Sequence, residues 1–205
     1  MARKKNLIIT EKALKMTKFH ENIADYIENH RKKCPKDVFC VAIDGGSASG
    51  KTTLCAYLEN RLGAQIIHCD DFFIPISERE KRDLRLGNLD FERFEGDVLQ
   101  KLGSEFSYRP FNCKTQALSD EIFVKKTDIV IVEGAYSHHP LIRKYFDLTI
   151  FLKISKDAQK KRVVARAPEK ADMFFAKWIP MEQAYFEKYA IIENADLVVD
   201  IDERT

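Results

Sequence analysis

The sequence predicts an α/β fold of three layers, with a mostly parallel sheet of about five strands and helices on both faces. Two observations lead to this fold class. Short apolar, β-branched runs alternate with helical patterns from residue 38 onward, which is the element order of a parallel sheet. The first run, residues 38–44, leads into a glycine-rich turn and then a helical pattern that continues through residues 54–62.

The glycine-rich turn matches the pattern G-x-x-x-x-G-K-[ST] without a mismatch. Its glycines allow backbone angles that a Cβ would obstruct, so main-chain N–H groups can close around phosphate oxygens, aided by the helix dipole. Lys51 is expected to reach the β- and γ-phosphates of ATP, and the Thr52 hydroxyl to bind Mg²⁺. The flanking pattern disfavours a glycine turn with a chance lysine and indicates a P-loop NTPase fold. The expected ATP-binding residues of this loop are Gly45, Gly46, Ser47, Ala48, Ser49, Gly50, Lys51, Thr52 and Thr53.

Length and composition fit one domain that is soluble and cytoplasmic. The 205 residues suffice for a single α/β domain with a small lid. With 34 basic and 32 acidic residues the net charge is only +2, which gives no case for nucleic-acid or membrane binding. The five cysteines fit no paired metal spacing and are expected to be reduced thiols. The apolar run at residues 6–10 is too short for a signal peptide or membrane span.

Residues 1–36 precede the first core strand. Phe19, Ile23 and Ile27 recur at helical spacing and predict an amphipathic helix. We therefore expect residues 1–36 to be an N-terminal helical extension packed on a single domain formed by residues 37–205.

The second buried strand, predicted at residues 65–69, is followed by Asp70 and Asp71. Ligands of open parallel sheets bind outside the carboxyl ends of the strands, and a hydroxyl that is to be phosphorylated needs a proton acceptor. Adjacent residues on an extended chain point to opposite sides, so one of the two carboxylates is expected to face a substrate. Capping of the next helix is the alternative for either residue.

The third buried strand, predicted at residues 127–134, ends in Glu133 and a glycine. Because Lys51 and Thr52 are present, this acid is expected to hold Mg²⁺ directly or through water. His138 and His139 follow, without a further ligand at metal spacing, and are expected to be loop histidines near the site. Further strands are predicted at residues 148–152 and 195–199, with a long helix at residues 173–189.

Two segments are open to more than one interpretation. The aromatic-rich residues 106–113 suit a β-hairpin arm or a loop that stacks on a flat substrate, and packing is favoured. The basic residues 160–166 suit a solvated helix face or a lid whose arginines close over a transferring phosphoryl group. The lid would span about residues 156–172.

Four motifs, in this order, resemble the uridine kinase family. They are the loop at residues 43–52, Cys-Asp-Asp-Phe-Phe at residues 69–73, Asn-Leu-Asp at residues 88–90 and Val-Glu-Gly at residues 132–134. The stretch Trp-Ile-Pro-Met-Glu at residues 178–182 is similar to the bacterial uridine kinase-like branch. Nicotinamide riboside kinases, pantothenate kinase and phosphoribulokinase are wider relatives. The resemblance covers roughly residues 38–200.

The resemblance implies roles for individual residues. Asp70 would be the catalytic base, with Lys51 and Arg162 as further catalytic residues, and Asp90 would hold the ribose hydroxyls. Thr52 and Glu133 would bind Mg²⁺. The remaining expected contacts are Arg166 for ATP and Phe73, Phe111, Tyr136 and His138 for the substrate. The histidine with which uridine–cytidine kinases read the pyrimidine has no obvious counterpart, and Gln116 stands roughly in its place.

The resemblance therefore implies an ATP- and Mg²⁺-dependent kinase for the 5′-hydroxyl of a nucleoside, with uridine or cytidine favoured. Its expected partners are this small-molecule substrate and a nucleoside triphosphate, with no nucleic acid and no membrane, and the sequence makes no prediction of oligomeric state. The alternatives are a kinase for another hydroxylated metabolite, such as nicotinamide riboside or pantothenate, and a non-catalytic nucleotide-binding regulator. The intact Lys51, Asp70 and Glu133 disfavour the regulator.

Overall fold

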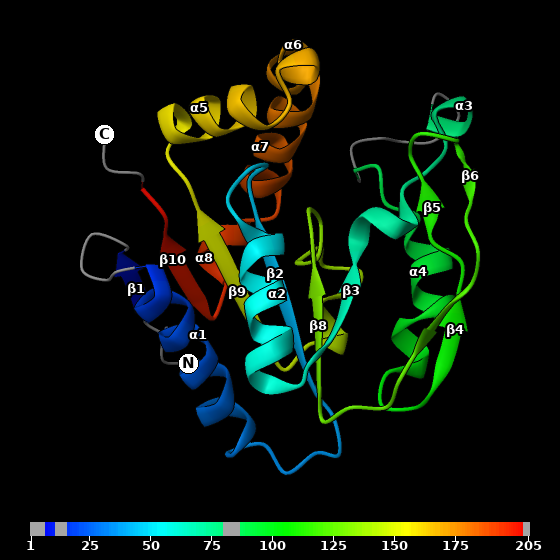
Figure 1. The fold of residues 1–205 in the computed structure, drawn as a ribbon, viewed down its shortest axis with the longest axis vertical. Helices are drawn as coiled ribbons and strands as arrows, with labels where there is room; N and C mark the ends of the chain where they lie inside the picture. Colours follow the sequence, from blue (N-terminus) through cyan, green and yellow to red (C-terminus); the bar gives the residue numbers. More distant parts are fainter. Residues whose placement is uncertain (1–6, 11–15, 80–86, 203–205) are drawn as a thin grey trace.

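A computed structural model describes residues 7–10, 16–79 and 87–202 of the chain (Figure 1). Its main sheet contains six strands, and every neighbouring pair is parallel. The predicted α/β class with a parallel sheet is confirmed. In spatial order the strands are β1 (Leu7–Thr10), β10 (Leu197–Asp200), β9 (Leu148–Lys153), β2 (Phe39–Gly45), β8 (Ile129–Glu133) and β3 (Gln65–His68).

The edge strand β1 is the one strand of this sheet that the sequence did not predict. Its register with β10 runs from Leu7 opposite Leu197 to Thr10 opposite Asp200. A four-residue apolar run carries little strand signal of its own, and its hydrogen bonds come from a strand 190 residues away in the chain. Of the predicted N-terminal extension, residues 1–6 and 11–15 lie outside the described residues.

One face of the sheet is covered by α1 (Met16–Arg31) and α2 (Lys51–Leu62). Phe19, Ile23 and Ile27 of α1 are at most 2% exposed and share one apolar cluster with Val41 and Ile43 of β2. The helical spacing of these apolar residues therefore serves to bury one side of α1 against the sheet.

The opposite face packs against the second half of the chain. Cys40 and Ala42 alternate with Val41 and Ile43 along β2, and they belong to a second apolar cluster. Buried residues of this second cluster come from the following elements: η2 (Cys69–Phe72), α4 (Phe91–Asp97), η4 (Leu99–Lys101), α7 (Ile179–Lys188) and α8 (Ile191–Asn194). The sheet is thus the middle of three layers, as predicted.

The aromatic segment forms part of an antiparallel arm beside the sheet. Two short ladders build it, one between β4 (Phe106–Tyr108) and β7 (Ile122–Val124), the other between β5 (Phe111–Asn112) and β6 (Ala117–Leu118). Tyr108 and Phe111 are 4% and 6% exposed. Hairpin packing, the favoured interpretation of this segment, is therefore the one that the structure adopts.

The predicted long helix at residues 173–189 is divided into turns of different kinds. After α5 (Lys156–Arg166) and η6 (Pro168–Lys170), the chain forms α6 (Ala171–Met173), a π-helical segment η7 (Phe174–Trp178) and then α7. Pro180 is the second residue of α7, directly after the π-helical segment, and as a proline it has no N–H to donate to the preceding turn. The helix therefore changes register before the proline. In Figure 1, α5, α6 and α7 stand together on one side of the carboxyl edge of the sheet, and α3 (Ile76–Arg79) with β5 and β6 on the other.

Among residues 7–10, 16–79 and 87–202, no helix combines the length and the apolar character that a membrane span requires.

We predict that Phe72→Ala lowers the free energy of unfolding by about 3–5 kcal/mol, because Phe72 is fully buried between aromatic neighbours. Its ring centroid lies 4.6 Å from that of Phe94 and 5.1 Å from that of Tyr108. Phe123→Ala is the matched control, since Phe123 is 58% exposed in β7, and it should change stability by less than about 1 kcal/mol. Urea unfolding measures both, and equal losses would contradict the burial of Phe72.

Candidate active site

The glycine-rich loop joins β2 to α2 at the carboxyl edge of the sheet. Gly45 has a φ of 150°, and a Cβ at this residue would lie 2.4 Å from the carbonyl oxygen of Leu152 in β9. Gly50 has a φ of 95° and Ala48 a φ of 62°, so the backbone turns through left-handed angles on its way to α2. The glycine at residue 45 is therefore required by the close approach of a neighbouring strand.

The ammonium of Lys51 is held against this loop. Its Nζ donates to the carbonyl oxygens of Gly45 at 2.7 Å and Gly46 at 3.1 Å. Lys51 is the first residue of α2, so the positive end of the helix dipole and the charged side chain lie together. This arrangement suits an anion at the loop.

Glu133, Thr52 and His68 form a second group next to Lys51. Thr52 Oγ1 donates to Glu133 Oε1 at 3.2 Å, and His68 Nδ1 lies 2.7 Å from the same oxygen. Burial alone would raise the pKa of Glu133, but the His68 hydrogen bond and the charges of Lys51 and His68 keep this pKa below its usual value. An ionised carboxylate beside a hydroxyl is the kind of oxygen donor set that suits Mg²⁺, so Thr52 and Glu133 fit this ion. The described residues hold no group of three or more His, Cys, Asp or Glu side chains that could bind a metal, so other oxygens would have to complete its coordination.

The two carboxylates after β3 point to different partners. Asp71 Oδ2 accepts from the Tyr108 hydroxyl at 2.7 Å and is thereby tied to the arm. Asp70 is exposed as a residue, but the protein atoms around its carboxyl group desolvate it. This desolvation, followed by the negative charge of Glu133, raises the pKa of Asp70 to about 6, against the opposing charge of Lys51. Of the two adjacent acids, Asp70 is the one whose pKa is affected by the charge of Lys51 in the loop, whereas Asp71 is bonded to Tyr108.

The Asn-Leu-Asp motif lies directly against the segment that follows Asp70. Asp90 N–H donates to Phe72 O, and Ile74 N–H donates to the oxygen of Asn88, both at 2.8 Å. Asp90 is also the N-cap of α4, where its Oδ1 accepts from Arg93 N–H at 3.3 Å. Two of the motifs that carry the family resemblance are therefore neighbours in space.

The two arginines of the predicted lid have different surroundings. Arg162 NH1 lies 3.4 Å from the carbonyl oxygen of Ala48 and 3.5 Å from that of Ser49, so it reaches the loop. Arg166 is exposed, and its guanidinium lies 5.6 Å from the ring centroid of Phe174. The structure brings Arg162 to the loop and does not bring Arg166 there.

The expected substrate contacts Phe111, Tyr136 and His138 are closed to solvent, at 6%, 4% and 5% exposure. The ring centroid of Tyr136 lies 4.9 Å from that of Tyr185, and Phe111 of β5 stands opposite Leu118 of β6 in the arm. Phe73 is half-buried beside Leu89. The structure therefore does not present Phe111, Tyr136 or His138 to a ligand at the loop: Tyr136 packs in the core, Phe111 lies in the arm, and the ring of His138 bonds to the carbonyl oxygen of Ala42.

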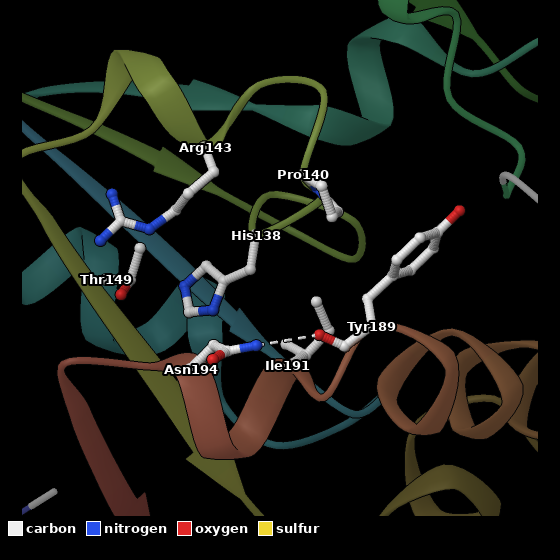
Figure 2. Close-up of a pocket in the computed structure, with 7 residues that line it drawn as sticks. All are labelled: His138, Pro140, Arg143, Thr149, Tyr189, Ile191 and Asn194. Atoms are coloured by element: carbon white, nitrogen blue, oxygen red, sulfur yellow. Dashed lines mark hydrogen bonds between the residues drawn. The ribbon is translucent and has the colours of Figure 1, made fainter. Parts of the chain in front are cut away.

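His138 instead turns its ring toward a separate pocket of about 270 Å³, shown in Figure 2. Thr149, the second residue of β9, lines this pocket, which places it toward the amino end of that strand. The polar groups around it already have protein partners: His138 Nε2 lies 3.1 Å from Ala42 O, Arg143 NH2 donates to Asp196 Oδ2, and Asn194 Nδ2 donates to Tyr189 O. The pocket is thus distinct from the loop site.

Asp44 is a residue of the site that the sequence analysis did not identify. It is fully buried, and its Oδ1 accepts from Gly45 N–H at 2.7 Å. Its Oδ2 accepts from His138 N–H at 3.2 Å and from the Tyr185 hydroxyl at 2.9 Å. Burial raises the pKa of Asp44 to about 6, although Lys51 and these hydrogen bonds oppose the rise. A charged residue that closes an apolar strand was the available signal.

Glu182 is a second residue of the site that the sequence analysis did not identify. Although 135 residues separate them, Glu182 accepts hydrogen bonds from the Ser47 N–H at 2.9 Å and from the Ser47 hydroxyl. Glu182 is 6% exposed, and burial raises its pKa against the opposing effects of Lys51 and Ser47. The sequence offered only its place in the stretch at residues 178–182.

The sequence relatives of the chain indicate its family. No model of a known protein family matches the chain. Over 153 residues the chain is 27% identical to uridine-cytidine kinase B of Dictyostelium discoideum, an alignment that covers 69% of this chain and 63% of that protein. Over 138 residues it is 30% identical to nicotinamide riboside kinase 1 of Homo sapiens, which covers 65% of this chain and 68% of that protein. The chain thus spans less than two thirds of the length of the Dictyostelium relative.

Solved structures agree on the fold. A Bacillus stearothermophilus structure described as a "Possible Uridine Kinase" superposes with a TM-score of 0.64 at 20% identity, covering 87% of this chain and all of that one. This similarity concerns the fold, while the human and Dictyostelium relatives concern the family. Together with the four motifs, they show that the chain belongs to the uridine kinase family, which in its wider sense includes the nicotinamide riboside kinases.

Proposed function

We propose that this chain is an ATP- and Mg²⁺-dependent kinase that phosphorylates the 5′-hydroxyl of a nucleoside, with uridine or cytidine favoured. The observation that carries the proposal is the convergence of Lys51, Glu133 and Asp70 at one edge of the sheet. The strand register supports this convergence, because Glu133 at the end of β8 stands opposite Ile43 of β2 and His68 of β3. Phosphoryl transfer needs a cation for the phosphates, oxygen ligands for a metal and a base for the hydroxyl, all within one region.

The loop and its surroundings would bind the triphosphate. The main-chain N–H groups of the loop and the Lys51 ammonium provide donors and positive charge, and Arg162 adds a guanidinium from the predicted lid. Thr52 and Glu133 would hold Mg²⁺, which, when bound, neutralises charge on the phosphate oxygens. Because Glu133 keeps its charge at neutral pH, it can serve this purpose without losing a proton first.

Asp70 would accept the proton of the acceptor hydroxyl. A general base works best when its pKa lies near the working pH, and the pKa of Asp70 is raised to about 6 by desolvation and by Glu133. Asp71, which is bonded to Tyr108, would instead fix the end of η2 to the arm. Asp90 lies beside this segment, which supports its proposed contact with the ribose hydroxyls.

Acceptors other than uridine and cytidine stay in consideration because of Gln116. Its Oε1 accepts from Ile76 N–H at 2.9 Å and its Nε2 donates to Cys113 O at 2.6 Å, so the backbone already uses both ends of the amide. A pyrimidine would therefore need another residue to read its edge. The human nicotinamide riboside kinase relative favours that metabolite as the second candidate, and pantothenate remains a third.

Asp70→Asn should reduce turnover by about 10²–10⁴-fold, because the amide cannot accept the hydroxyl proton, while ATP still binds. A coupled assay of ADP formation with acceptor present, together with equilibrium binding of ATP, measures the two effects. Asp71→Asn is the matched control at the adjacent carboxylate and should lose much less activity. Near-normal turnover by the Asp70 variant would overturn the assignment of the base.

The acceptor kcat/KM at saturating MgATP should follow the ionised fraction of Asp70, so it should be about half its maximum near pH 6, fall below that pH and level off about one pH unit above it. The sign follows from the role, since only the ionised carboxylate accepts a proton. Rates measured from pH 5 to pH 8 give the profile, and Asp71→Asn should keep the same acid limb. A profile with no acid limb near pH 6 would count against Asp70 as the base.

A panel of nucleosides and vitamins, scored for ADP release above the ATP-only background, identifies the acceptor. We expect release with uridine or cytidine. Release with nicotinamide riboside or pantothenate alone would support the second group of acceptors. Silence across the panel, with ATP bound, would support a non-catalytic nucleotide-binding regulator and contradict the proposal.

A further inference from the structure

Ser47, at the tip of the loop, uses all three of its polar groups to bind two helices from the C-terminal part of the chain. Its N–H and its hydroxyl donate to the two oxygens of Glu182 in α7. Its carbonyl oxygen accepts from Gln159 Nε2 in α5 at 3.0 Å. The loop therefore does not stand free: its third residue is attached on one side to α7 and on the other to α5.

From this attachment we propose that Glu182 is a positioning residue, which acts through Ser47 to hold the loop at residues 45–50 in the shape that binds the nucleotide. The inference rests on the proposed function, because it assumes that the loop binds a nucleotide. It adds to that function a carboxylate that touches neither phosphate nor acceptor and still sets the affinity for ATP.

The backbone of the loop explains why an anchor is needed. Gly45, Ala48 and Gly50 have positive φ angles, and few main-chain hydrogen bonds stabilise the turn, among them Ser49 N–H to Gly46 O at 3.1 Å. A loop that must be ordered on binding loses affinity to conformational entropy, and a loop that is already ordered does not. Two hydrogen bonds to one buried carboxylate are strong enough to supply this order, since a charged acceptor makes them stronger than neutral bonds.

Glu182 acts together with Tyr185 on the same face of α7. The two residues are three positions apart, so their side chains leave the helix on one side. Tyr185 donates to Asp44 Oδ2, and Asp44 in turn accepts from Gly45 N–H. One helix face thus fixes the loop both at its start and at its tip.

The competing explanation is that Glu182 excludes the nucleotide by its charge. The carboxylate lies close enough to Lys51 to feel its field, so an incoming triphosphate would meet a negative group there. The two explanations predict opposite results when the charge is removed while the hydrogen bonds are kept. Glu182→Gln does this, because its amide oxygen can accept from the Ser47 N–H and its amide nitrogen can donate to the Ser47 hydroxyl oxygen.

The test compares Glu182→Ala with Glu182→Gln by two measurements on the full chain. Hydrogen exchange of the peptide that covers residues 44–53, without nucleotide, should be about tenfold faster in the Ala variant. The Kd for ATP should rise about tenfold in the Ala variant, and KM for ATP should rise more than kcat falls. The Gln variant should rescue both the exchange rate and the Kd.

Two further variants serve as controls. Glu187→Ala removes an exposed glutamate from the same helix and should change neither exchange nor Kd. Ser47→Ala removes only the hydroxyl, so it should have a smaller effect than Glu182→Ala, and combining the two should add little because they remove the same contact. Ser47→Ala also keeps the test decisive if Glu182→Ala fails to fold.

Each result supports or overturns the proposed role of Glu182. Unchanged loop exchange in both Glu182→Ala and Ser47→Ala would overturn the anchor. Tighter ATP binding in both Glu182 variants would overturn positioning in favour of exclusion by charge. If the unaltered protein binds no ATP, the proposed function fails and the effect on affinity fails with it, while the exchange measurement still shows whether Glu182 holds the loop.

Discussion

The carboxylate of Asp44, fully buried at the end of β2, is the interaction on which the rest of the site depends. A charge in that position is tolerated only if hydrogen bonds satisfy it, and the donors come from three separate segments: Gly45 in the loop, His138 after β8 and Tyr185 in α7. These segments are far apart in the chain, and Asp44 accepts a hydrogen bond from each of them. Satisfying this one buried acid therefore helps to fix the position of the loop relative to β8 and α7, together with the bonds from Ser47 to Glu182 and from Thr52 to Glu133.

The fold was predictable where the local sequence determines it. A strand buried on both faces is a continuous apolar run, and the runs at residues 38–44 and 127–134 coincide with β2 and β8 to within one or two residues at every end. The strand β1 was not predictable, because four residues at a sheet edge become a strand through pairing with β10. The π-helical turn before Pro180 was missed for a similar reason, since helical periodicity does not show a change of register.

In the candidate site, too, some residues could be predicted from the local sequence and others depend on contacts between distant parts of the chain. Lys51, Thr52 and Glu133 could be placed from the sequence because each occupies a fixed position relative to a strand end or a glycine turn. The partnership of Ser47 with Glu182 could not, because helix packing brings together residues 135 positions apart. Side-chain direction was the other gap: the backbone N–H of His138 reaches Asp44, and its ring turns away from the loop to Ala42.

The electrostatics of the site explain how neighbouring acids could have different tasks. Asp44, Asp70, Glu133 and Glu182 all lie within the field of Lys51, and burial acts on each of them. Burial raises the pKa of Asp70, whereas His68 and Lys51 hold the pKa of Glu133 low. Asp70 therefore binds a proton more tightly than Glu133 does. Such divergence is what separates a proton acceptor from a permanently ionised metal ligand. A triphosphate adds negative charge beside these acids, and a divalent cation at Thr52 and Glu133 would offset that charge where it is greatest. The charges of these acids thus support the proposed dependence on Mg²⁺.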